Sequence, residues 1–98
     1  MVLQTTGDSC RASISGKFTF GDNAAFRGVL DTIEDPKIQQ VIIDLSNVEF
    51  IDSAALGMLL LANDEVRKAK KKLSITGVNG QVKRIFEMAK FDQHFQMV

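Results

Sequence analysis

The feature that most constrains the fold is a short apolar run that leads, through a polar connection, into a long helix-forming segment. Residues 41–45 read VIIDL, a β-branched run with little alternation that is typical of a strand covered on both faces in a parallel sheet. From Ser53 to about Lys70 good helix formers dominate and no proline intervenes, which predicts a helix. Residues 46–51 are expected to be the connection. This order favours an α/β fold centred on residues 41–45.

The N-terminal part of the sequence adds a hairpin and a helix. Apolar or small residues occupy the even positions of residues 10–20 and polar residues the odd ones, which predicts a half-buried strand. The turn residues 7–9 allow this strand to pair with a short strand at residues 2–3. Asp22 is expected to be the N-cap of the first helix, and Pro36 to end it.

The C-terminal part adds a strand at residues 73–78, a turn at residues 77–80 and a third helix. Residues 94–98 are a terminal strand or a loose tail. The apolar face of the third helix is expected to consist of Val82, Ile85, Phe86 and Ala89. We therefore expect one domain over residues 1–98 that belongs to the α/β class, with a mixed or mostly parallel sheet of four to five strands and covering helices.

Charge and apolar patterning exclude several functions. Lys plus Arg and Asp plus Glu number 12 each, so no surplus of positive charge favours nucleic-acid binding. The basic cluster at residues 67–72 is interpreted as the cationic end of a helix. The longest apolar or small run, residues 54–62, is too short for insertion into a membrane. We expect neither nucleic acid nor direct membrane insertion.

The single cysteine, Cys10, excludes an internal disulfide and fits a reducing compartment. It falls on the apolar face of its strand, where inert packing is the simplest role. The N-terminus does not resemble a targeting peptide, so a cytoplasmic location is expected. No Cys and His pattern indicates a metal site, and no cofactor is expected.

Ser53 is the candidate functional residue, because it stands where a buried strand passes into a helix. Asp52 or Ser53 can cap that helix and do nothing more. The small residues Ala54, Ala55 and Gly57 that follow leave the serine open to another molecule. Phosphorylation here adds about −1.5 to −2 charges at the favourable end of the helix dipole. The pattern thus favours a modified binding site.

A catalytic serine is disfavoured. A nucleophile elbow needs glycine two residues before and two residues after the serine, but these positions hold Ile51 and Ala55. The only histidine, His94, lies in the C-terminal segment with no evident orienting acid. We expect a protein that acts by binding and is not an enzyme.

The motif around Ser53 resembles the signature of the STAS domain family, which includes the bacterial anti-sigma factor antagonists. The resemblance is carried by DLS at residues 44–46 and by FIDSAALG at residues 50–57, and it extends over almost the whole chain, including the segments at residues 16–18 and 73–79. Where many members have Ser-Gly after the serine, this sequence has Ala54-Ala55, which keeps both positions small.

The resemblance implies a partner switch. The unphosphorylated domain binds an anti-sigma factor that is also a GHKL-type serine kinase, phosphorylation of Ser53 breaks the complex, and a PPM-type phosphatase restores it. Asp22 matches a family position near the phosphorylated serine. The residues expected to contact the partner or kinase are Asp22, Asp52, Ser53, Ala54, Ala55, Gly57 and Met58.

The resemblance also leaves a second function open. STAS domains resemble regulatory subunits of transporters, including a soluble subunit of a bacterial lipid-transport complex whose partner hydrolyses nucleotide. In that case the domain binds constitutively. The run at residues 58–61, MLLL, is read as core, with part of it available to a partner.

Overall fold

Five strands form one mixed sheet in the spatial order β1-β2-β3-β4-β5. The computed structural model describes residues 1–97. In chain order the elements are β1 (Val2–Thr6), β2 (Ser9–Phe18), the 3-10 turn η1 (Phe20–Asp22), α1 (Asn23–Glu34), β3 (Gln40–Ile51), α2 (Ser53–Lys68), β4 (Lys72–Thr76), α3 (Gly80–Met88), the 3-10 turn η2 (Phe91–Gln93) and β5 (Gln96–Met97).

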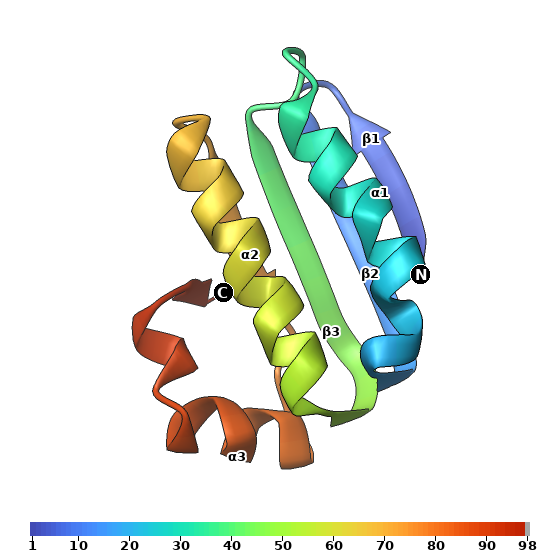
Figure 1. Cartoon of the computed structure of the whole chain (residues 1–98), viewed down its shortest axis with the longest axis vertical. Coiled ribbons are helices and arrows are strands. Elements are labelled where there is room, and N and C mark those ends of the chain that lie inside the picture. The colour runs from blue at the N-terminus through green and yellow to red at the C-terminus, as the bar shows by residue number, and fades with distance from the viewer. Residues whose placement is uncertain (98) are drawn as a thin grey trace.

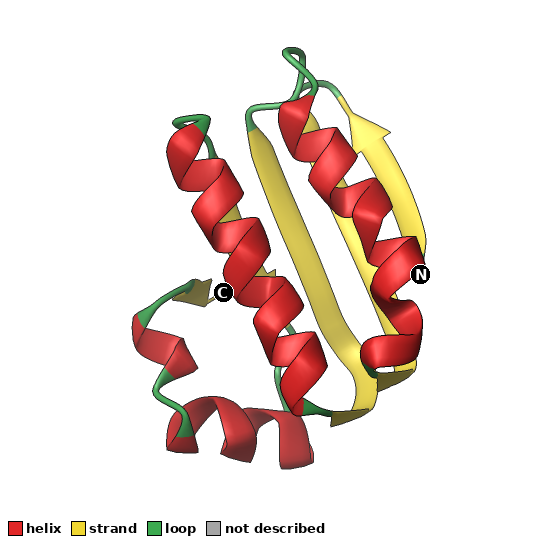
Figure 2. Cartoon of the chain, viewed as in Figure 1, coloured by secondary structure: helices red, strands yellow, loops and turns green. Residues whose placement is uncertain are grey.

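The sheet begins with an antiparallel hairpin and continues with parallel strands. β1 pairs antiparallel with β2, and the remaining neighbours pair in parallel. α1 and α2 lie side by side on one face of the sheet, while α3 lies across its lower end (Figure 1). Figure 2 shows the same two layers coloured by secondary structure. The predicted small α/β domain with a mixed sheet is confirmed.

The core fills the space between the sheet and the two helices. Alternate residues of β3 face this layer, and Val41, Ile43 and Leu45 are fully buried there. Ile42 and Asp44, on the opposite face, are only half-buried. The opposite face instead carries a polar hollow of about 340 Å³ lined by Arg11, Gln40, Ile42, Lys72, Ser74, Thr76 and Gln96. The expectation that residues 41–45 are covered on both faces is wrong, because both long helices lie on one side.

β3 is much longer than expected. Residues 46–51, predicted as a connection, continue the strand and pair with β2 across two register irregularities. Val48 and Ile51 within this segment are buried. The irregularities disturb the alternation, since a bulge shifts side chains relative to the partner strand. The true connection to α2 is Asp52 alone.

The C-terminal segment closes the core with aromatic side chains. Val82 and Phe86 of α3 are buried, as predicted for its apolar face, whereas Ala89 is exposed. The rings of Phe91 and Phe95 each lie close to the ring of Phe86. The expected terminal strand is short, Gln96–Met97, and Val98 lies outside the described residues. Within residues 1–97, no helix is long and apolar enough to cross a membrane.

Candidate functional site

The junction between β3 and α2 is capped by Asp52. Its side-chain Oδ1 accepts a hydrogen bond from the backbone N–H of Ala55 at 2.8 Å, and its backbone is extended, as an N-cap requires. Ser53 is therefore the first residue of α2, and it is exposed. Of the two capping alternatives the structure selects Asp52, so Ser53 is not needed as the cap.

The same carboxylate reaches a second segment. Asp52 Oδ2 accepts a hydrogen bond from the backbone N–H of Phe20 at 3.2 Å, and the backbone N–H of Asp52 donates to the carbonyl oxygen of Phe18 at 3.3 Å. Asp52 thus joins the end of β2 and η1 to the start of α2. The turn before α1 and the start of α2, which carries the exposed serine, are therefore held next to each other.

Thr19 and Asp22 shape η1 through a capping box. The N–H of Gly21 donates to Thr19 Oγ1 at 3.3 Å, and the N–H of Thr19 donates to Asp22 Oδ2 at 3.0 Å. Asp22 does occupy the N-cap position of α1, but among residues 1–97 its side chain makes no capping bond there. The prediction that Asp22 is the N-cap residue of α1 is confirmed in position, but its carboxylate bonds to the N–H of Thr19 in η1 and not to α1.

Phe20 is the residue of this site that the sequence interpretation missed. The alternation of residues 10–20 places Phe20 on the buried face, but β2 ends at Phe18 and η1 turns the chain. Phe20 is 67% exposed as a result. The available signal was the spacing of Thr19 and Asp22, three residues apart, which is typical of a capping box.

The residues after Ser53 that were expected to contact a partner divide into a set that is at least partly exposed and a buried set. Ala54 is half-buried and Gly57 is exposed, and a Cβ added at Gly57 would meet nothing within 4 Å. Ala55 and Met58 are 0% and 8% exposed and belong to the core. The expectation that these two side chains contact a partner is therefore corrected. The run at residues 58–61 is half core and half surface, since only its last two leucines are exposed.

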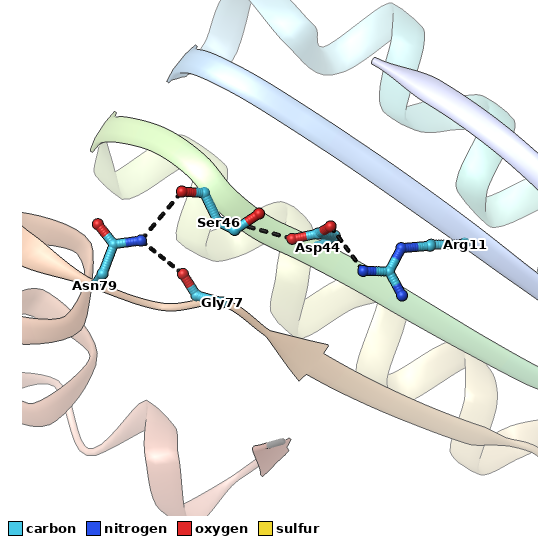
Figure 3. A network of polar contacts seen from close by, with 5 residues as sticks. All are labelled: Arg11, Asp44, Ser46, Gly77 and Asn79. Carbon is cyan, nitrogen blue, oxygen red and sulfur yellow. Dashed lines mark hydrogen bonds and ion pairs between the residues drawn. The ribbon is translucent and has the colours of Figure 1, made fainter.

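A second polar cluster joins β2 and the middle of β3 to the segment that leads from β4 to α3 (Figure 3). Arg11 donates to the Asp44 carboxylate at 2.8 Å, and the N–H of Ser46 donates to the other oxygen of Asp44 at 2.9 Å. Asn79 Nδ2 donates to the carbonyl oxygens of Ser46 and Gly77 at 3.1 and 2.8 Å. The hydrogen bonds from Ser46, and after them the Arg11 guanidinium, hold the pKa of Asp44 below its usual value of 3.8.

The other candidate residues have structural roles. Cys10 is buried, and this burial raises the pKa of its thiol. His94 packs against Phe91 in the C-terminal aromatic group. In the basic cluster, Lys71 Nζ donates to the carbonyl oxygens of Ile33 and Asp35 and so caps the C-terminal end of α1. Within residues 1–97 no cluster of three His, Cys, Asp or Glu side chains could hold a metal ion.

Comparison with known proteins identifies the family to which the chain belongs. Residues 1–98 match the model of the STAS domain. A STAS-domain containing protein of Pseudomonas aeruginosa is 30% identical over 91 residues, which cover 93% of this chain and 89% of the relative.

Two kinds of solved structure share the fold. The unphosphorylated form of the anti-sigma factor antagonist SpoIIAA of Bacillus superposes with a TM-score of 0.78 at 14% identity, over 99% of this chain and 86% of SpoIIAA. Its phosphorylated form gives a TM-score of 0.77 at 14% identity, over 99% and 89%. A sulfate transporter family protein from Wolinella succinogenes gives a TM-score of 0.73 at 25% identity, over 85% and 67%. By its sequence match and its fold, the chain belongs to the STAS domain family.

Proposed function

We propose that this domain is an anti-sigma factor antagonist whose binding is switched by phosphorylation of Ser53. The observation that carries the proposal is the position of Ser53: it is exposed at the first position of α2 while Asp52 does the capping. Its modification therefore costs no helix-capping bond. The similarity to SpoIIAA, which has been solved in an unphosphorylated and a phosphorylated form, supports the same assignment.

The proposed partner is an anti-sigma factor that is also a GHKL-type serine kinase. In the transfer step, Ser53 Oγ forms a bond to the γ-phosphorus of ATP and the bond to the leaving ADP breaks, while the hydroxyl proton passes to a base of the kinase. A PPM-type phosphatase hydrolyses the phosphoserine and restores the binding form. The domain itself contributes a binding surface in the cytoplasm and no catalytic group.

The charge at the site explains how the phosphate would act. A phosphoserine brings about −1.5 to −2 charges, which the positive end of the α2 dipole accommodates without unfolding the helix. The Asp52 carboxylate beside it is already negative, so the surface seen by a partner becomes strongly anionic. We restrict the proposed contact surface to residues that are at least partly exposed: Asp22, Asp52, Ser53, Ala54 and Gly57.

A second function is favoured by one comparison. The sulfate transporter family protein has the higher sequence identity of the two solved proteins, 25% against 14%. The domain would then be a constitutive regulatory subunit of a transporter complex, such as one of the lipid-transport type. The two functions differ in whether modification of Ser53 changes binding.

Calorimetry with two variants distinguishes these functions. The Ser53→Ala variant should bind a GHKL-type anti-sigma kinase of the same organism as tightly as the unphosphorylated wild type. Ser53→Asp should bind at least about tenfold more weakly, because it adds charge at the interface. Equal affinities of the two variants would eliminate the switch.

A further inference from the structure

Phe20 combines high exposure with a tightly held backbone. Phe20 is 67% exposed, yet its backbone N–H donates to the Asp52 carboxylate, and the residues on both sides of it are fixed by the Thr19–Asp22 capping box. The N–H of Asp22 also donates to the carbonyl oxygen of Thr19 at 2.9 Å. The ring is therefore carried on a rigid turn and not on a loose loop.

The Asp52 carboxylate fixes Phe20 relative to Ser53. One oxygen holds the start of the helix that carries Ser53, and the other holds the backbone of Phe20. η1 and α2 are in direct contact, and η1 lies at the same end of the sheet as the start of α2 (Figure 1). A protein that approaches Ser53 closely enough to modify it thus meets the Phe20 turn as part of the same surface.

Exposed aromatic residues on rigid backbone are good binding anchors. Burial of a ring of this size in a partner is favourable, and a turn that is already ordered loses little entropy on binding. Few interface residues carry most of the binding energy, and they are often aromatic residues that fill a pocket. Within residues 1–97, Phe20 is exposed and is not part of the buried core.

We infer that Phe20 is an anchor for the protein that recognises Ser53, and that Asp52 is the positioning residue that holds it there. The inference rests on the proposed function and specifies the partner further: the anti-sigma kinase has an apolar pocket for the ring beside the place where it receives the serine. Because one carboxylate binds the backbone of both Phe20 and Ala55, two residues after Ser53, charge added at Ser53 acts close to the contact that Phe20 makes with the partner.

Two variants test the two parts of this inference. Phe20→Ala removes the ring and leaves its backbone bond to Asp52. Asp52→Asn keeps an oxygen that can accept from the N–H of Ala55, but it replaces the acceptor of the Phe20 N–H with an amide donor. Met88→Ala is the matched control, because Met88 is 78% exposed and lies on α3. All three variants should fold, which circular dichroism checks.

The readouts are the affinity for a GHKL-type anti-sigma kinase of the same organism and the KM and kcat of Ser53 phosphorylation. Phe20→Ala should weaken binding about thirtyfold, the size expected for an interface anchor, and raise KM with little change in kcat. Met88→Ala should stay within about twofold of wild type. In Asp52→Asn the Phe20 amide should exchange its hydrogen faster while the Ala55 amide does not, and affinity should fall by less than in Phe20→Ala.

The possible failures are distinguishable. If wild type binds the kinase and Phe20→Ala binds equally well, Phe20 is not an anchor although the proposed function survives. If the Phe20 amide is equally protected in Asp52→Asn and wild type, Asp52 is not the positioning residue. If the wild-type domain neither binds such a kinase nor gains a phosphate on Ser53, the proposed function fails and this inference fails with it.

Discussion

The two strand-to-helix junctions of the parallel sheet use their capping residues in opposite ways. At the β3–α2 junction, Asp52 caps the helix with its side chain and leaves Ser53 exposed. At the β4–α3 junction, Asn79 stands at the N-cap position, but its side-chain amide bonds to Ser46 and Gly77 and, within the described residues, makes no capping bond. The first junction leaves Ser53 exposed at the start of its helix, and the second links β3 to the segment that follows β4.

The largest expected effect is at the second junction, where Gly77 is pressed against β3. Gly77 has φ +80°, and a Cβ built on it would lie 2.6 Å from the Cβ of Ser46. Gly77→Ala should destabilise the fold by about 2–4 kcal/mol, because left-handed strain and a backbone clash add. Urea denaturation measures the change.

Gly57→Ala is the matched control at the first junction. Gly57 is inside α2 with open space around its Cα, so alanine should stabilise the domain by about 0.5–1 kcal/mol. If Gly77→Ala changes the free energy of unfolding no more than Gly57→Ala does, Gly77 is not tightly packed against β3.

The next largest effect concerns the caps themselves. Asp52→Ala should cost about 1–2 kcal/mol of stability, because it removes a helix cap and the bond to Phe20. Asn79→Ala should cost about 0.5–1.5 kcal/mol, because the two hydrogen bonds that it removes are exposed and neither of them caps α3. Thermal denaturation of the pair decides the order, and a larger loss for Asn79→Ala would reverse our assignment of the two roles.

The smallest effect is a dependence on pH at the second junction. The pKa of Asp44 is lowered in the folded state from 3.8, first by Ser46 and then by Arg11. Its contribution to stability is therefore present above pH 3.8 and is lost as the pH falls through the folded-state pKa. Between about pH 5 and 3, wild type should lose more stability than Asp44→Asn. Urea denaturation at several pH values measures this difference. If the free energies of unfolding of both proteins change in parallel over this range, the ionised Asp44 carboxylate contributes nothing to stability.

Much of the fold could be predicted from periodicity, but the extension of β3 to Ile51 and the outward turn of Phe20 could not. The alternation of β2 and the helical faces of α1 and α3 follow directly from their apolar spacing. The extension of β3 to Ile51 could not be predicted, because two register irregularities interrupt the alternation on which a strand assignment depends. The polar composition of residues 46–51 therefore suggested a loop.

The candidate site was predicted in part. The motif located Ser53 and the small residues after it, since their spacing is local. The outward turn of Phe20 depends on bonds from Asp52, 32 residues further along the chain, which no local pattern reveals. The burial of Met58 likewise depends on how α2 meets the sheet, because a helix that is apolar nearly all round does not indicate which residues face the core.

Intact-mass analysis of the domain tests the central claim most directly. The wild type and the Ser53→Ala variant are each incubated with ATP and a GHKL-type anti-sigma kinase of the same organism. Our account predicts that wild type gains the mass of one phosphate, that peptide fragmentation places it on Ser53, and that Ser53→Ala gains none. An unmodified wild type, or a phosphate that the Ser53→Ala variant still acquires, would contradict it.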